Sequence, residues 1–196
     1  LFRLFEIQFE PPLSAQKREA ISSQGYGSYF AAHVLVEAEA SKYWVEKGTS
    51  ILALLTDSPI GVIYGRSYYQ AQQHKTQPQY HMLSLLVTGA YAEQFNARTG
   101  ALDPIREELT QELEKLWPGF TKYIKKWEFH RYHPRAIAAW PVGRSRFDEL
   151  SEAIRKPENS LYMAGDFTES SHSDGAVYSG LRVTKDILTH LKKEPH

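Results

Sequence analysis

The stretch Leu161-Tyr-Met-Ala-Gly-Asp-Phe-Thr-Glu-Ser-Ser-His-Ser-Asp-Gly-Ala-Val-Tyr-Ser-Gly180 carries the most informative pattern of this 196-residue chain. Its apolar start, Leu161 to Ala164, predicts a buried strand that leads into Gly165-Asp166. A polar loop follows, and a helix with small residues in its first turns is predicted from about Gly175 to Lys193. A helix N-terminus offers unpaired N–H groups and a partial positive charge, so the unit suits a phosphate or a carbonyl that carries negative charge. The competing interpretation is a surface helix with Ser and Asp capping after a Gly-Asp turn.

The rest of the chain predicts a mixed α/β or α+β fold. Alternating or continuous apolar runs predict strands at Phe5 to Phe9, Tyr29 to Val36, Ile51 to Leu55, Ile60 to Tyr64, Tyr80 to Thr88 and Tyr123 to Tyr132. Capping and apolar spacing predict one helix from the N-cap Ser14 to Ile21 and another from Asp103-Pro104, with Asp103 as its cap, to Trp117. Residues 134–157 are predicted to be loop-rich.

Composition excludes several classes of function. Lys plus Arg and Asp plus Glu both total 23, so no basic excess points to nucleic acid or to an anionic membrane surface. Cysteine is absent, which rules out disulfides and a Cys nucleophile in this sequence. No run approaches 18 apolar residues, so no transmembrane segment is predicted. The opening residues read as mid-protein sequence and not as a signal peptide, and we expect a fragment or processed chain in the cytoplasm.

The segment from Leu161 to Gly180 resembles the C-terminal flavin motif of the amine oxidase superfamily. The shared order is an apolar strand, Ala-Gly-Asp, a loop, an acid followed by Gly-Ala-Val, two further residues and a Gly. Monoamine oxidases, protoporphyrinogen oxidase and phytoene-type desaturases share that motif. The Pro-Pro-Leu-Ser and Lys-Arg-x-Ala-Ile of Ile7 to Ile21, and the strand ending near Trp44, are also similar to the family. The resemblance implies a substrate-domain mixed or antiparallel sheet with helices over residues 1–135. It implies the last strand and helix of a Rossmann-like FAD-binding domain over residues 136–196.

The resemblance also implies FAD as the cofactor. Gly165 and Asp166 would contact its ribityl-phosphate region. The helix start, Asp174-Gly175-Ala176-Val177, would face the flavin pyrimidine edge, where backbone N–H groups stabilise the negative charge of the reduced ring. The sequence has no Gly-x-Gly-x-x-Gly loop, so we expect a preceding segment or a separate chain to supply it. The other expected partners are a small-molecule amine and a second copy of the chain.

Four residues are candidates for the substrate pocket implied by the resemblance. Trp140 and His172 take the places of the aromatic pair in front of the flavin, and we assign them catalytic roles. Arg144, within the loop from Trp140 to Phe147, could bind a substrate carboxylate with two parallel hydrogen bonds, and Phe147 would line the same site. The plainer alternative is a surface loop with ordinary ion pairs. No metal site is expected, because the odd separation of His130 and His133 puts them on opposite faces of a strand.

The function implied is oxidation of a C–H bond next to an amine nitrogen, with hydride transfer to flavin N5. Tyr29 to Val36 lacks the Lys that amine oxidases of the family usually carry there. This absence favours a dehydrogenase or a desaturase over an oxidase. Two alternatives stay open: a desaturase-type flavoprotein with a lipid-like substrate, and a non-catalytic accessory subunit that keeps the fold.

Overall fold

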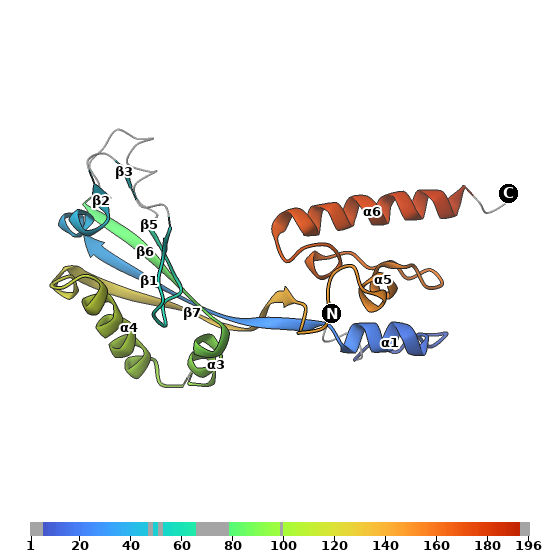
Figure 1. The fold of residues 1–196 in the computed structure, drawn as a ribbon, viewed down its shortest axis with the longest axis horizontal. Helices are drawn as coiled ribbons and strands as arrows, with labels where there is room; N and C mark the ends of the chain where they lie inside the picture. Colours follow the sequence, from blue (N-terminus) through green and yellow to red (C-terminus); the bar gives the residue numbers. More distant parts are fainter. Residues whose placement is uncertain (1–5, 47–48, 51–52, 66–78, 99, 193–196) are drawn as a thin grey trace. The chain divides into compact units, whose positions relative to one another are not determined.

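A computed structural model of the chain describes residues 6–46, 49–50, 53–65, 79–98 and 100–192 (Figure 1). The chain divides into two compact units. The sheet unit is Ser28–Ala136, and the terminal unit combines Leu1–Gly27 with Ile137–His196. The division expected at residues 135 and 136 lies beside one of these boundaries. However, the first 27 residues belong with the C-terminal part.

A five-stranded sheet with the order β4-β5-β6-β1-β7 forms the centre of the sheet unit. The strands are β1 (Gly25–Glu37), β4 (Leu54–Leu55), β5 (Val62–Gly65), β6 (Tyr80–Thr88) and β7 (Ile124–Ala139). β1 and β6 pair antiparallel, from Tyr29 opposite Thr88 to Glu37 opposite Tyr80. β5 pairs antiparallel with both β4 and β6. A separate antiparallel pair consists of β2 (Val45–Glu46) and β3 (Thr49–Ser50).

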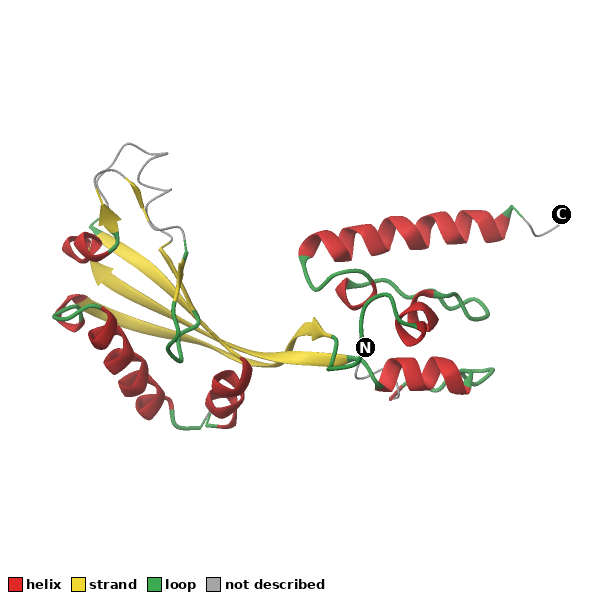
Figure 2. Ribbon diagram, in the orientation of Figure 1, coloured by secondary structure: helices red, strands yellow, loops and turns green. Residues whose placement is uncertain are grey.

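Helices cover one face of this sheet (Figure 2). They are α3 (Gly89–Ala97) and α4 (Leu102–Leu116). One short 3-10 helix, η2 (Ala38–Tyr43), directly follows β1, and another, η3 (Thr121–Tyr123), directly precedes β7. Alternate residues of β1, including Phe30, Ala32 and Val34, are fully buried because the pleat turns them toward this layer. α4 buries Ile105, Leu109 and Leu113, and α3 buries Ala92 and Phe95 in the same core.

The sequence predicted most of this unit. β6 has the predicted bounds. α4 ends at Leu116, and the predicted end residue Trp117 is its C-cap. The two strands predicted at Ile51 to Leu55 and Ile60 to Tyr64 form in part as β4 and β5. Residues 51 and 52 lie outside the described residues. The capping role of Asp103 was wrong, because the N-cap is Ala101 and Asp103 lies in the first turn, paired with Arg106 at 2.7 Å. The sequence analysis did not predict α3.

The terminal unit contains α1 (Ala15–Ser22), α5 (Glu149–Arg155), η4 (Asp166–Thr168) and α6 (Ser173–Leu191). Its core is a small cluster of buried apolar residues: Leu13, Ala20, Ile21, Ile154 and Met163. α1 begins as predicted, since the Ser14 hydroxyl accepts a 3.1 Å hydrogen bond from the Lys17 backbone N–H.

Three predictions fail in this unit. Residues 6–9 form no strand. The segment 134–157 is not loop-rich throughout, because β7 continues to Ala139 and Asp148 caps α5 through a 2.7 Å bond to the Ser151 N–H. Leu161 to Ala164 makes only an isolated bridge, between Leu161 and Glu158. A buried strand needs neighbouring strands on its edges, and no described strand of this unit lies beside that segment.

α6 has an apolar side that this chain leaves exposed. Val177, Leu181, Leu188 and Leu191 are between 54% and 63% accessible. Their spacing places them along one side of the helix. Such a contiguous apolar stripe is typical of a surface that another segment covers.

Candidate functional site

The N-terminus of α6 has no side-chain cap. The N-cap residue His172 has an extended backbone and makes no side-chain capping bond; its carbonyl accepts a 3.2 Å bond from the Ala176 N–H. Ser173, Asp174 and Val177 are exposed. The opening N–H groups of the helix, which carry a partial positive charge, therefore receive no capping bond from the N-cap side chain. Such a terminus is suited to bind a carbonyl or phosphate oxygen.

The Gly165-Asp166 turn is held by hydrogen bonds on both sides. The Gly165 N–H donates to the Ser179 hydroxyl at 2.8 Å. The Gly165 carbonyl accepts from the Thr168 N–H at 3.0 Å and from the Thr168 hydroxyl at 2.8 Å. Gly165 has φ +148°, and a Cβ there would lie 2.4 Å from the Phe167 ring. Only glycine fits this conformation and this space.

Gly175 marks a second close approach. A Cβ at this position would lie 2.1 Å from the Ser170 carbonyl oxygen. The loop before α6 therefore folds directly onto the first turn of the helix. The Ser170 hydroxyl also contacts Asp174 at 3.3 Å. The loop that follows Gly165 and Asp166 thus packs against the first turn of α6, which contains the other predicted cofactor residues.

Tyr26 is a neighbour of Asp166 that the sequence analysis missed. Burial and the nearby Asp166 carboxylate raise the pKa of Tyr26 to about 12. The phenol therefore stays neutral at ordinary pH, beside the charge of Asp166. No local sequence signal connects two residues so far apart along the chain.

The Trp140 loop is organised by Arg144. Its guanidinium binds both carboxylate oxygens of Asp148, at 2.6 and 3.2 Å, and donates to the carbonyl and hydroxyl of Ser23. This arrangement favours the structural alternative for Arg144 over carboxylate binding. Trp140 is half-buried, and its indole N–H donates to the Ser151 hydroxyl at 3.1 Å. The Trp140 ring is therefore fixed at its polar edge.

The remaining predicted substrate residues are exposed. Phe147 is 76% accessible, and the Arg146 guanidinium lies 4.4 Å from its ring centre. His172 is also exposed and contributes its backbone to the start of α6. The side chains of His130 and His133 lie outside the described part. Among the described residues, no group of three or more His, Cys, Asp or Glu could hold a metal ion.

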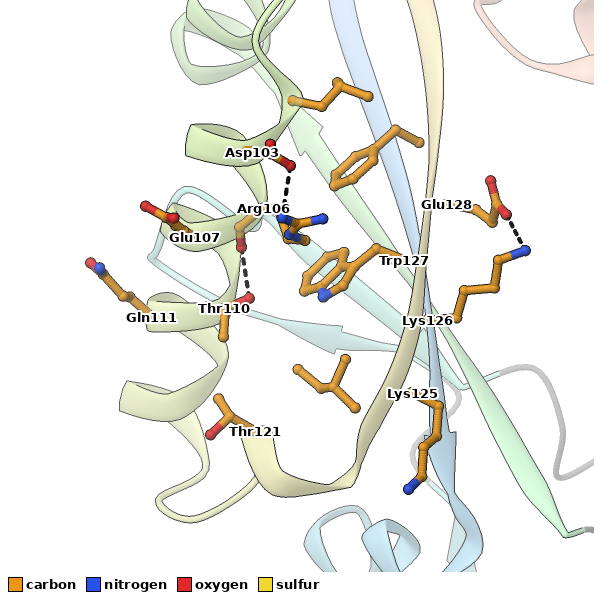
Figure 3. Close-up of a pocket in the computed structure, with 13 residues that line it drawn as sticks. Asp103, Arg106, Glu107, Thr110, Gln111, Thr121, Lys125, Lys126, Trp127 and Glu128 are labelled. Carbon is orange, nitrogen blue, oxygen red and sulfur yellow. Dashed lines mark hydrogen bonds and ion pairs between the residues drawn. The ribbon is translucent and has the colours of Figure 1, made fainter.

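The sheet unit has a separate open groove of about 940 Å³ between α4 and β7 (Figure 3). Trp127 points from β7 toward α4, and its ring stacks on Phe129 at 5.6 Å with an interplanar angle of 5°. None of the predicted site residues lines this groove. Three ion pairs involve residues that line it: Asp103 with Arg106, Lys126 with Glu128, and Lys125 with Glu37.

The terminal unit fits one end of a flavin cofactor. An uncapped helix start can receive a polarised carbonyl. The two glycines let the Phe167 ring and the Ser170 backbone pack directly against the main chain at this end. The residues that would hold this end are Gly165, Asp166, Asp174, Gly175, Ala176 and Val177. No described helix of the chain has both the length and the apolar character needed to span a bilayer.

The chain has a mixed α/β fold with an antiparallel sheet and a C-terminal helix preceded by a glycine turn. The family description "flavin containing amine oxidoreductase" matches residues 3–188. The chain belongs to this family.

Known relatives agree with this assignment. L-amino-acid oxidase from Vipera ammodytes ammodytes is 26% identical over 192 residues, covering 92% of this chain and 37% of the relative. L-amino-acid oxidase from Demansia vestigiata is also 26% identical, with 92% and 35% covered. The chain thus spans little more than a third of the length of these curated relatives.

Two solved structures share the fold. Cyclohexylamine oxidase from Brevibacterium oxydans superposes with a TM-score of 0.74 at 18% identity, covering 96% of this chain and 41% of that one. Putrescine oxidase bound to putrescine superposes with a TM-score of 0.67 at 16% identity, covering 95% and 40%.

Proposed function

We propose that this chain is the flavin-contacting and substrate-domain part of an FAD-dependent oxidoreductase. Its reaction would oxidise a C–H bond next to the nitrogen of an amine or an amino acid. The observation that carries the proposal is the uncapped start of α6 beside the Gly165-Asp166 turn. The names of the relatives, which include amino-acid, cyclohexylamine and putrescine oxidases, support the substrate class.

Bound FAD would supply the hydride acceptor. The chain's own residues would bind and orient the partners. Backbone N–H groups at the start of α6 would stabilise negative charge on the ring. Trp140, fixed through Ser151, would form an aromatic wall for the substrate. An amine that arrives neutral needs no general base from the protein.

We further propose that a segment carrying the Gly-x-Gly-x-x-Gly loop covers the exposed stripe of α6. A side of α6 with four apolar residues more than half accessible would be costly to leave in water. Leu181→Glu on this stripe should weaken association with that segment. Thr189→Glu, which is also exposed on α6 but lies off this stripe, is the matched control.

The first test is the visible spectrum of the native particle that contains this chain. Bound flavin should give bands at about 370 and about 450 nm. Adding an amine or amino acid without oxygen should bleach them, and comparing reoxidation by oxygen with that by artificial acceptors separates an oxidase from a dehydrogenase. A colourless particle would instead support an accessory subunit. A yellow particle that amines do not bleach but a lipid-like substrate does would support the desaturase alternative.

The second test uses Asp166→Ala. We expect this variant to lose FAD on dilution, since Asp166 would contact the ribityl-phosphate region. Asp103→Ala removes an exposed carboxylate in the sheet unit and should retain FAD. Equal FAD retention by the two variants would refute the assignment of Asp166.

The third test concerns Trp140. Trp140→Ala should slow flavin reduction more than it lowers the melting temperature. Trp140→Phe keeps an aromatic ring and loses only the bond to Ser151, so it should reduce the flavin faster than the Ala variant does. A loss of stability with no change in reduction rate would leave Trp140 a structural residue.

A further inference from the structure

Ser179 links the Gly165 turn to the first turn of α6. Its side chain is fully buried. The hydroxyl accepts a 2.8 Å bond from the Gly165 N–H and donates a 2.6 Å bond to the Ala176 carbonyl. One buried hydroxyl therefore fixes the distance between the two backbone segments that would face the cofactor.

Arg182 holds the same turn from both flanks. Its guanidinium donates to the Met163 carbonyl at 2.9 Å, two residues before Gly165. It also donates to the Thr168 hydroxyl at 3.3 Å and pairs with Glu169 at 2.8 Å, beyond the turn. A planar guanidinium with several donors can make such a set of bonds, whereas a Lys ammonium cannot match its geometry.

The two residues act from one face of the helix. They are three positions apart, so their side chains are neighbours on α6. Their bonds reach backbone atoms and the side chains of Thr168, Glu169 and Asp186, and none of these bonds uses the Asp166 carboxylate. The network thus fixes the path of the turn. It leaves the Asp166 carboxylate, which would contact the cofactor, outside its hydrogen bonds.

We propose that Ser179 and Arg182 are positioning residues, which set the geometry of the Gly165-Asp166 turn against the start of α6 and through it the affinity for the flavin. The cofactor part of this inference rests on the proposed function. The positioning part concerns only this chain's own atoms.

The experiment compares Ser179→Ala and Arg182→Met with Thr184→Ala. Thr184 lies on the same helix, is exposed, and returns its hydroxyl to the Gly180 carbonyl at 2.9 Å. Amide hydrogen exchange of residues 163–170 is measured without added FAD. We expect faster exchange in the first two variants and no change in Thr184→Ala, because only the first two remove bonds to the turn.

The dissociation constant for FAD is then measured on the native flavin-containing particle, with its melting temperature as a separate readout. Ser179→Ala and Arg182→Met should bind FAD at least about tenfold more weakly. Arg182→Lys keeps the charge but loses the planar set of N–H donors, so its affinity for FAD should resemble that of Arg182→Met. An Arg182→Lys variant with normal affinity would refute positioning by geometry.

The outcomes separate the two claims. Unchanged exchange in residues 163–170 overturns the positioning role, whatever the cofactor. Faster exchange together with a lower melting temperature but unchanged FAD affinity reduces the network to a stabilising one and overturns the inference. A wild-type particle without flavin overturns the proposed function and the cofactor part, while the exchange data still decide whether Ser179 and Arg182 hold the turn.

Discussion

Gly175 lies so close to Ser170 that a Cβ on the glycine would be 2.1 Å from the Ser170 carbonyl oxygen. The loop before α6 therefore depends on the absence of a side chain at this position. Gly180, five residues further along the same helix, has nothing within 4 Å of its equivalent position. The two glycines provide a matched pair in one helix.

Gly175→Ala should destabilise the terminal unit by about 1–3 kcal/mol, because the backbone of the loop or of the helix must move. Gly180→Ala should stabilise it by about 0.5–1 kcal/mol, since Ala favours helix and meets open space. Urea denaturation of both variants measures the difference. Equal stability of the two variants would contradict the close approach of Gly175 to Ser170.

Lys17, a residue of α1, has a buried side-chain amine that binds the end of α5. Its ammonium donates to the carbonyls of Ala153 at 2.6 Å, Ile154 at 3.3 Å and Lys156 at 2.5 Å. Lys17→Met should lower the free energy of unfolding by about 1–3 kcal/mol, because these carbonyls lose their buried donor. Lys185→Met, at an exposed position on α6, should change it by less than about 0.5 kcal/mol.

The pH dependence of the Lys17 effect follows from its pKa. Burial, the largest influence, lowers the pKa of Lys17 below its usual 10.5. The unfolded chain therefore holds the proton more tightly, and Lys17 makes the fold more stable as pH rises from the lowered value to 10.5. When the free energy of unfolding is measured against pH, the wild-type curve should contain this rise on its alkaline side. The curve of Lys17→Met should lack it. Parallel curves would contradict the burial of the amine.

Asp148 should contribute stability that disappears in acid. The hydrogen bond from Arg144 is the main influence that lowers the pKa of Asp148 well below its usual 3.8. A carboxylate with a depressed pKa stabilises the fold above its unfolded pKa, and this contribution is lost as pH falls through the folded value.

Asp148→Asn keeps a side chain that can cap α5 but removes the charge. It should lower the free energy of unfolding by about 1–2 kcal/mol at pH 7, and by progressively less below pH about 4. Denaturation at a series of pH values measures this convergence. A difference that stays constant down to pH about 2 would assign the effect to the cap and not to the charge.

The sequence predicted the elements whose signals are local. β6 is a nine-residue, largely apolar run, and α4 repeats Ile105, Leu109 and Leu113 at helical spacing. The family motif also located the start of α6 near Gly175, whereas the strand expected before Gly165 does not form. Asp103 was misplaced as a cap because a favourable local residue type does not fix the first helical residue to within two positions.

The amino-acid sequence by itself determined the family, the small residues at the start of α6 and the absence of a Gly-x-Gly-x-x-Gly loop. Only the tertiary structure decided that Arg144 binds Ser23, that Tyr26 is a neighbour of Asp166, and that the Lys17 amine is buried against the end of α5. The physical reason is distance along the chain. Capping and periodicity act within a few residues, whereas the partner of a buried charge or of an arginine can lie more than a hundred residues away, and only packing brings the two together.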